Sequence, residues 1–247
     1  MLVLLRLLLC FAPYDPTAVP LSRAVVLAGS GAPTDDLDAP EADERPARVV
    51  DVASLSIDPT EVTRAAYTAC VLAGPCVTRR VEWDDLLSLV PMTEVCWDEA
   101  VAYCKAVGAR LPTEVEWERA ARGSHPMDGR RFPWGDEPAC ERANWGNFEG
   151  EGRCPANPGH PVAVARYKAT SDGIYDLAGN VWEWTADYYG RSHTTPTARG
   201  SEELGRAPRR SVRGGACCSI LAAPRIANRV GWPEDYRDAD LGFRCVR

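Results

Sequence analysis

Apolar residues recur with helical spacing in two segments of the first half of the chain. Between residues 93 and 108, an apolar stripe repeats every three or four residues: Trp97, Ala100, Val101, Cys104 and Val107. This spacing predicts an amphipathic helix, and Gly108 is suited to end it because glycine readily takes the left-handed conformation that follows many helices. A second helix is predicted after Pro112, because Thr113 and Glu116 have the spacing of a capping box.

The rest of the pattern favours short elements. Residues 49–58 alternate in part between apolar and polar side chains and predict a strand. Residues 59–74 begin with Pro-Thr-Glu, are rich in alanine and end at a Gly-Pro break, which predicts a turn followed by a helix. After Gly123 the pattern is mostly strand and loop, and 20 glycines and 20 prolines indicate a loop-rich domain.

The first 48 residues differ from the remainder. Residues 1–12 are apolar, shorter than the roughly 18 residues that span a bilayer, and similar to the apolar region of a signal peptide. A lipid anchor at Cys10 and a wrongly assigned start codon are the alternatives. The stretch 29–48 is acidic, rich in Pro and Ala and free of aromatic residues, which predicts a flexible linker. We therefore divide the chain into an apolar N-terminal segment (1–28), this linker and one domain (49–247).

Charge and cysteine content restrict the function. The net charge is −7 and the isoelectric point about 5.1, so the basic footprint of a nucleic-acid-binding protein is missing. Ten cysteines are many for a cytosolic protein, and neither a CxxC pair nor clustered histidines indicate a zinc site. We therefore expect disulfides and an exported protein, periplasmic, on the cell surface or secreted.

Two disulfides are expected from proximity along the chain. Cys70 and Cys76 flank the Gly-Pro break, and Cys140 and Cys154 flank a loop rich in Asn and Gly. The pairing of the remaining cysteines cannot be deduced from spacing. One of the adjacent residues 217 and 218 could bridge to Cys96.

Six motifs follow one another in the second half of the chain and point to a known family. They are RLPTEVEWERAARG (110–123), FPWGDE (132–137), SDGIYDLAGNVWEWTADYY (171–189), RSVRGGA (210–216), RIANR (225–229) and LGFRCVR (241–247). In this order they resemble the formylglycine-generating enzyme family, also called the sulfatase-modifying-factor domain. The resemblance implies a single α+β domain of the C-type-lectin-like type, with two helices, little regular secondary structure and long ordered loops.

The resemblance also implies a disulfide and a metal site. Cys104 and Cys245 occupy positions that are bonded in enzymes of the family. In DLAGNVWEW, two carboxylates and a glycine turn offer the hard oxygen ligands that calcium prefers. The family positions for calcium are Asp176 and Glu183 through side chains, and Gly179 and Val181 through carbonyls. A second calcium site of the family begins near Asn144, but its other ligands are not recognisable.

The copper site of the family is altered in this chain. In the oxidase, an Arg-Gly-Gly-Ser turn precedes two cysteines five positions apart, whose soft thiolates hold copper(I). Here Ala216 replaces the serine, and the adjacent Cys217 and Cys218 are the only cysteines from 215 to 229. We therefore expect no copper. The two cysteines remain candidates for a redox role, with structural cysteines as the alternative.

These observations predict an exported binding or structural module, with an active formylglycine-generating oxidase as the alternative. The expected partner is a protein or other ligand, with no nucleic acid and with membrane contact only through the N-terminus, and the chain is expected to be a monomer. No pair of carboxylates stands out as a general acid and base. The glutamates of the second predicted helix are expected to be exposed charges and caps: Glu114, Glu116 and Glu118.

Overall fold

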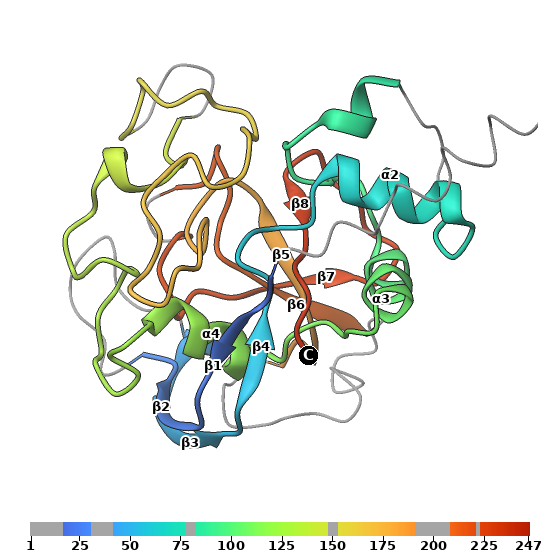
Figure 1. The fold of residues 1–247 in the computed structure, drawn as a ribbon. Helices are drawn as coiled ribbons and strands as arrows, with labels where there is room; N and C mark the ends of the chain where they lie inside the picture. Colours follow the sequence, from blue (N-terminus) through green and yellow to red (C-terminus); the bar gives the residue numbers. More distant parts are fainter. Residues whose placement is uncertain (1–16, 31–41, 78–82, 148–152, 191–207, 221–222) are drawn as a thin grey trace, which may run out of the picture.

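The computed structural model describes residues 17–30, 42–77, 83–147, 153–190, 208–220 and 223–247. In this part of the chain it contains three α-helices: α2 (Arg64–Ala73), α3 (Trp97–Ala106) and α4 (Glu114–Arg122) (Figure 1). The family resemblance led us to expect two helices. The additional one is α2, in the alanine-rich segment whose own pattern predicts a helix.

The strands form two short ribbons and one sheet. In the ribbons, β1 (Val19–Leu21) pairs with β4 (Leu55–Ile57), and β2 (Ala24–Ala28) pairs with β3 (Arg48–Val52), both antiparallel. The sheet has four strands in the order β7 (Val230–Pro233), β6 (Arg209–Arg213), β5 (Trp182–Tyr188) and β8 (Leu241–Gly242). Only its β5–β8 pair is parallel. The strand expected at 49–58 is thus two strands, which belong to different ribbons.

The helix ends follow the local signals of the sequence. Thr63 caps α2, its hydroxyl accepting a hydrogen bond from the amide of Ala66 at 3.2 Å. Gly74 ends the same helix in a left-handed conformation with φ of 98°. The capping box predicted at Thr113 and Glu116 is present at the start of α4.

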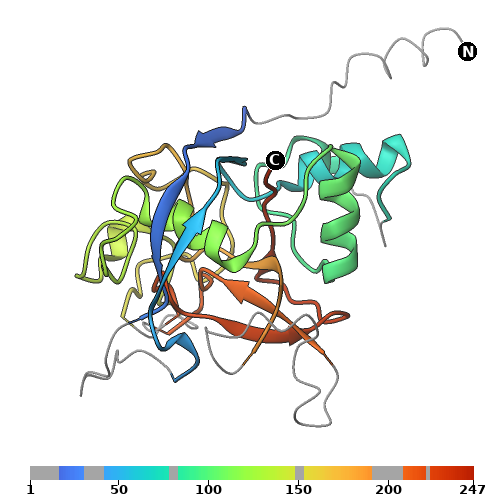
Figure 2. The ribbon, with the colours of Figure 1, turned by 90° about the horizontal axis from the view of Figure 1, so that it is seen from below.

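Helix α4 lies between the β2–β3 ribbon and the four-stranded sheet (Figure 2) and contacts β2, β3, β5 and β6. Its Trp117 is fully buried in one core, together with apolar residues of the ribbons and of the loops. A second core lies between α2, α3 and the sheet and contains the stacked rings of Tyr67 and Tyr103. A third, smaller cluster lies in the loops and contains Trp145 and Cys154. The described residues therefore have three apolar centres.

Long loops make up much of the domain, as the sequence predicts. From the end of α4 to the start of β5, the described residues contain no regular element except the 3-10 helix η3 (Cys140–Arg142). The other 3-10 helices of the described part are η1 (Ala42–Glu44) and η2 (Trp83–Leu87). None of the described helices is long and apolar enough to cross a membrane.

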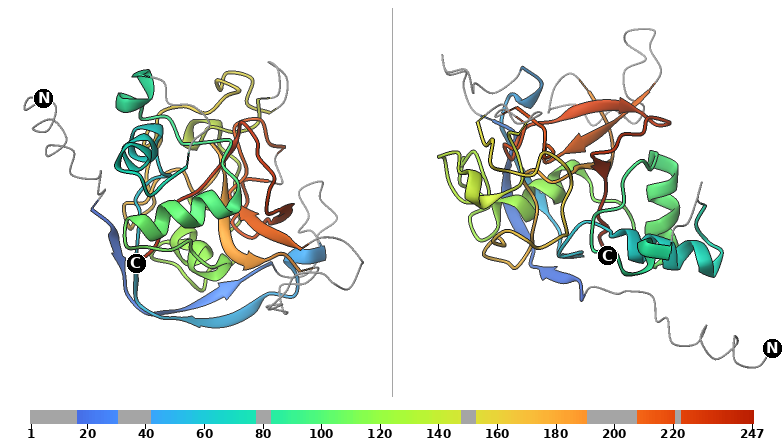
Figure 3. Two further views of the ribbon diagram at one scale, coloured as in Figure 1. Left: turned by 90° about the vertical axis from the view of Figure 1, so that its right-hand side faces the viewer. Right: turned by 90° about the horizontal axis from the view of Figure 1, so that it is seen from above.

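The chain ends beside its own N-terminal ribbons. Arg247 donates its amide hydrogen to Ser56 of β4 at 2.7 Å, and Ser56 donates back at 2.8 Å. Val246 forms bridges with Ile57 and Arg110. Figure 3 shows the C-terminus next to these strands from two further directions. The last residues therefore join the β1–β4 ribbon to the start of α4.

The domain begins earlier than the predicted boundary at residue 49. Strands β1 and β2 lie before that boundary and pair with β4 and β3. Glu44, from the predicted flexible linker, is fully buried and accepts hydrogen bonds from Arg225 at 2.7 and 2.8 Å. Residues 17–30 and 42–48 thus belong to the packed fold, because long-range partners supply the contacts that their composition does not reveal. The rest of both predicted segments, 1–16 and 31–41, lies outside the described residues.

Candidate functional site

The Gly-Gly turn follows strand β6 and positions the two adjacent cysteines. Gly214 and Gly215 have φ angles of 94° and 71°, in the region that favours glycine. A Cβ at Gly215 would lie 2.8 Å from the carbonyl carbon of Ala223. The second turn position therefore has no room for a side chain, and the chain after it is held against the neighbouring loop.

Cys217 and Cys218 lie side by side after this turn. Their Sγ atoms are 3.5 Å apart, and the Cys218 thiol donates to the carbonyl oxygen of Gly159 at 3.0 Å. Cys217 is only 1% exposed, whereas Cys218 is partly exposed. The main chain of Cys217 is anchored on both sides, because its amide donates to Asn180 at 3.1 Å and its carbonyl accepts from Asn147 at 3.3 Å.

This environment keeps Cys217 in the thiol form. Burial raises the pKa of Cys217 far above its usual range, and the neighbouring Cys218 raises it further. Since the thiolate is the nucleophile and the metal ligand, Cys217 lacks the environment of a reactive cysteine. Cys96, at the start of α3, is also a free thiol, so the alternative bridge from Cys96 to the adjacent pair is wrong.

Three disulfides stabilise the loops around this region. They join Cys70 to Cys76, Cys104 to Cys245, and Cys140 to Cys154, with Cα separations of 5.4, 5.7 and 5.4 Å. These are the three pairs that the sequence predicts. The second bridge connects α3 to the last residues of the chain inside the α2–α3 core.

The glutamates of α4 are not the exposed charges that the sequence suggests. Glu114 is 7% exposed and Glu118 is fully buried. The reason is the position of α4 between the ribbon and the sheet, which covers both sides of the helix. Only Glu116 has the expected capping role, accepting a hydrogen bond from the amide of Thr113 at 2.8 Å.

Each buried carboxylate of α4 is neutralised by arginines from the motifs. Glu114 pairs with Arg229 at 2.6 Å. Glu118 pairs with Arg213, the residue before the Gly-Gly turn, and with Arg122 at 3.3 Å. Leaving one such buried charge without its partner is strongly destabilising. Arg213 and Arg229 therefore hold the strand before the Gly-Gly turn and the RIANR segment against α4.

The predicted calcium segment contains three residues in left-handed conformations, Asp176, Gly179 and Asn180. Asp176 has a φ of 57°, and its carboxylate accepts a hydrogen bond from the amide of Ala165 at 2.7 Å. Gly179 has a φ of 79°, and a Cβ there would lie 2.1 Å from the carbonyl oxygen of Asn144. The turn between Asp176 and Val181 therefore depends on glycine at this position.

Glu183, the second predicted side-chain ligand, lies on β5 and is fully buried. Its two oxygens accept hydrogen bonds from Arg244 at 2.8 Å each, and one of them also accepts from the indole nitrogen of Trp117 at 2.9 Å. Glu183 is thus the anion of a buried ion pair. The structure places it near the other carboxylates of the segment but gives it partners within the protein.

A further carboxylate, Glu61, joins this segment from the turn before α2. Its Oε1 accepts from the side-chain amide of Asn180 at 3.0 Å, while Oε2 has no hydrogen-bond partner among the described residues. Burial raises the pKa of Glu61 well above its usual range, and the charge of Asp176 raises it further. Glu61 is not among the calcium ligands predicted from the sequence. The only available signal was an acidic residue in an otherwise uncharged Pro-Thr-Glu-Val turn.

The residues around Glu61 and Asp176 fit a calcium ion. Calcium takes six to eight oxygen ligands, and a cation would satisfy the unpartnered oxygen of Glu61 and offset the repulsion between the two carboxylates. In the described part of the chain, no group of three or more His, Cys, Asp or Glu side chains is arranged to hold a metal. Main-chain oxygens, such as those of Gly179 and Val181, would have to complete the coordination.

Asn144, where a second calcium site was expected to begin, connects loops. Its side-chain amide donates to the carbonyl of His160 at 2.9 Å and to the side chain of Asn180 at 3.2 Å. Asn180 in turn contacts Glu61. Asn144 is thereby linked to the first carboxylate cluster through Asn180.

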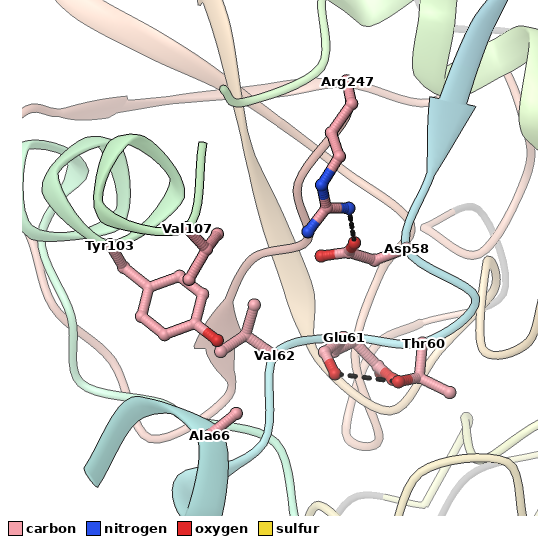
Figure 4. Close-up of a pocket in the computed structure, with 8 residues that line it drawn as sticks. All are labelled: Asp58, Thr60, Glu61, Val62, Ala66, Tyr103, Val107 and Arg247. Carbon is pink, nitrogen blue, oxygen red and sulfur yellow. Dashed lines mark hydrogen bonds and ion pairs between the residues drawn. The ribbon is translucent and has the colours of Figure 1, made fainter. Parts of the chain in front are cut away.

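A small cavity adjoins Glu61 (Figure 4). It has room for about one water molecule. The ion pair between Asp58 and Arg247, 2.8 Å long, forms part of its wall. Its lining is Asp58, Thr60, Glu61, Val62, Ala66, Tyr103, Val107 and Arg247. A cavity of this size can hydrate the buried carboxylate but cannot hold an organic substrate.

The fold, the Gly-Gly turn after β6 and the arginines that hold it to α4 define a formylglycine-generating-enzyme-like domain. The family model described as the sulfatase-modifying factor enzyme 1-like domain matches residues 14–247. The chain belongs to this family.

The proteins with similar sequences include one that is named as an enzyme and one that is named as inactive. The formylglycine-generating enzyme of Streptomyces coelicolor is 37% identical over 167 residues, which cover 63% of this chain and 52% of that protein. The inactive C-alpha-formylglycine-generating enzyme 2 of Bos taurus is 36% identical over 160 residues, which cover 63% of this chain and 50% of that protein. The matched regions thus span about half the length of these relatives.

Among solved structures, PvdO from Pseudomonas aeruginosa has the same fold. It superimposes with a TM-score of 0.71 at 20% sequence identity, covering 92% of each chain. This similarity shows the fold alone.

Proposed function

We propose that this chain is a binding module of the family and does not carry out the copper-dependent oxidation. The adjacent cysteine pair is the observation that supports this proposal. Two sulfurs on opposite sides of one copper(I), with metal–sulfur bonds of about 2.3 Å, would lie about 4.6 Å apart. The Sγ atoms of Cys217 and Cys218 are 3.5 Å apart and belong to neighbouring residues.

The state of the thiols supports the same proposal. Copper(I) ligation and nucleophilic attack both need thiolates, and the raised pKa of Cys217 disfavours that form. One relative in the family, from Bos taurus, is named as an inactive formylglycine-generating enzyme. The alternative, an active formylglycine-generating oxidase, rests on the motif order and on relatives such as the Streptomyces enzyme.

The deciding experiment is an oxidation assay on a peptide that contains Cys-X-Pro-X-Arg. The purified chain, copper(I), a reductant and oxygen are incubated with this peptide, and its mass is followed. We expect no conversion of the cysteine to formylglycine, while the Streptomyces enzyme serves as the positive control. A copper-dependent product that disappears in Cys217→Ser or Cys218→Ser would refute the proposal.

We further propose that calcium binds between Glu61 and Asp176, with the carbonyls of Gly179 and Val181 as additional ligands. The oxygen of Glu61 that lacks a hydrogen-bond partner among the described residues supports this site, as does the burial that raises the pKa values of both carboxyl groups. A cation at this point would connect the turn before α2 to the loop before β5. Its expected contribution is to stability.

Calcium removal tests this site. A chelator is expected to lower the melting temperature of the wild-type protein, and Glu61→Gln and Asp176→Asn should abolish that dependence. Glu183→Ala is a less suitable variant, because it would leave the buried Arg244 without its carboxylate partner and destabilise the fold with or without calcium. An unchanged wild-type melting curve after chelation would contradict the proposal.

We propose that the protein is exported. We also propose that it is a monomer and that its partner is a protein or another ligand. Its three disulfides support an oxidising compartment, because such bonds are rare where thiols are kept reduced. Expression with and without an export signal, followed by non-reducing mass measurement, tests this point. Correct pairing of the bridges in a reducing cytosol would argue against it.

A further inference from the structure

The adjacent cysteines are held as a pair by the loop that carries them. The amide of Ala216 donates to the Ser219 hydroxyl at 2.8 Å, which closes the turn around Cys217 and Cys218. The amide and carbonyl of Cys217 have further partners in two other loops, at Asn180 and Asn147. With the main chain fixed in this way, the two Sγ atoms lie 3.5 Å apart.

This separation suits a bound atom that bonds to both sulfurs with a bent sulfur–atom–sulfur angle. With centre–sulfur bonds of about 2.3 Å, sulfurs 3.5 Å apart subtend an angle of about 100° at the bound atom. A linear two-coordinate ion would need a far wider separation. A tetrahedral ion would need two further ligands, and the described residues offer no group of three or more His, Cys, Asp or Glu side chains for a metal.

We propose that Cys217 and Cys218 form a bidentate binding site for a trivalent arsenical with one organic substituent. Such an arsenic centre is pyramidal, so two sulfurs and one carbon complete its coordination without a further protein ligand. The partly exposed Cys218 provides access, and the buried Cys217 closes the chelate. This site is independent of the proposed binding function and of calcium.

The reaction conserves oxidation state and starts from neutral thiols. A hydrated arsenical carries two hydroxyl groups on arsenic. Two sulfur–arsenic bonds form, two arsenic–oxygen bonds break, and each thiol proton leaves with a hydroxyl group as water. Arsenic stays trivalent and no oxidant takes part. Because burial disfavours the thiolate of Cys217, the partly exposed Cys218 forms the first sulfur–arsenic bond, and Cys217 forms the second at high effective concentration.

Phenylarsine oxide is the probe for this site, used on the full chain under non-reducing conditions that keep the disulfides intact. We expect one arsenical per wild-type chain and the loss of two titratable thiols. The adduct should resist an excess of a monothiol and be removed by a dithiol. Cys217→Ser and Cys218→Ser should each weaken binding roughly 100-fold, because the second bond of a chelate forms at high effective concentration. Cys96→Ser, which removes a free thiol outside the pair, is the matched control and should bind like wild type.

Peptide mapping of the wild-type protein makes the test independent of variant folding. Trypsin releases residues 214–225, which contain Cys217 and Cys218 and no other cysteine. After treatment with the arsenical, both cysteines in this peptide should be protected from alkylation. The proposal is overturned by adducts that persist in either serine variant, by alkylation of both cysteines in the treated protein, or by a disulfide between them in the isolated chain.

Discussion

At the scale of single residues, the turn with the predicted calcium ligands and the turn with the adjacent cysteines both depend on glycines, which have no side chain. Gly179 lies under the carbonyl of Asn144, and Gly215 lies against the main chain of Ala223, so each allows two loops to touch. Both have positive φ angles, in which a side chain is strained even where space is free. The turn at Gly179 and the turn at Gly215 are therefore held by close contacts between main chains.

Gly179→Ala is expected to lower the free energy of unfolding by at least about 3 kcal/mol, the combined cost of a left-handed alanine and an overpacked contact. Gly108→Ala is the matched control, because Gly108 has a similar φ of 71° but no atom within 4 Å of an added Cβ. It should cost only about 1 to 2 kcal/mol. Denaturant unfolding with the disulfides intact and calcium chelated measures both, and equal losses would contradict the close contact.

Asp240 gives a prediction for pH. Burial raises the pKa of its carboxyl from 3.8 to about 6, and Asp238 contributes by repulsion. Because the folded state holds this proton more tightly than the unfolded state, the contribution to stability is present at low pH and lost as pH rises through about 6. Asp240→Asn should therefore be more stable than wild type at pH 7 and little different below pH 3.8. Melting temperatures at several pH values test this, and a difference independent of pH would contradict it.

At the scale of elements, buried ion pairs attach the N-terminal ribbons to the motif region. Glu44, in the 3-10 helix η1 between β2 and β3, pairs with Arg225 of the RIANR motif and also accepts from the Ser30 hydroxyl at 2.9 Å. The amide of Gly29 donates to Glu118 of α4 at 3.0 Å. The ribbons are thus held by charges as well as by apolar contacts.

Glu44→Gln is expected to cost about 3 to 5 kcal/mol, because it leaves the buried guanidinium of Arg225 without a counter-charge. Asp51→Asn is the control within the same ribbon, since the Arg23–Asp51 pair has side-chain exposures of 71% and 47%. Its effect should be much smaller, because solvent screens this exposed pair. Denaturant unfolding again provides the measurement. If the two variants lose the same free energy, the Glu44 pair does not anchor the ribbons.

At the scale of the whole molecule, the Cys104–Cys245 bridge links the middle of the chain to its end. It closes a segment of 141 residues, whereas the Cys70–Cys76 bridge closes one of 6. Both lie in the α2–α3 core. The longer connection constrains the unfolded chain more.

Replacing Cys104 and Cys245 together by alanine should therefore cost about 5 kcal/mol, and the same change at Cys70 and Cys76 about 2 kcal/mol. The four cysteines have comparable burial, so the loss of side-chain volume is similar in both variants. Guanidinium unfolding of the two double variants gives the comparison. A larger loss at the short bridge would show that local packing, not chain connectivity, dominates.

The sequence by itself determined the features that depend on neighbouring residues or on a fixed order of motifs. The capping box at Thr113, the apolar stripe of α3, the three disulfides and the family all follow from such patterns. Local hydrogen bonding and side-chain periodicity act over a few residues, so their signals can be read directly from the chain.

Only the tertiary structure decided what covers each charge and which segments share a site. Glu114 and Glu118 lie on a helix with normal polar spacing, yet the ribbons and the sheet bury them. Glu61 comes next to Asp176 across more than a hundred residues, and the Cys217–Cys218 separation depends on three loops. The pKa of a group and its partners depend on burial and on long-range contacts, which no local pattern specifies.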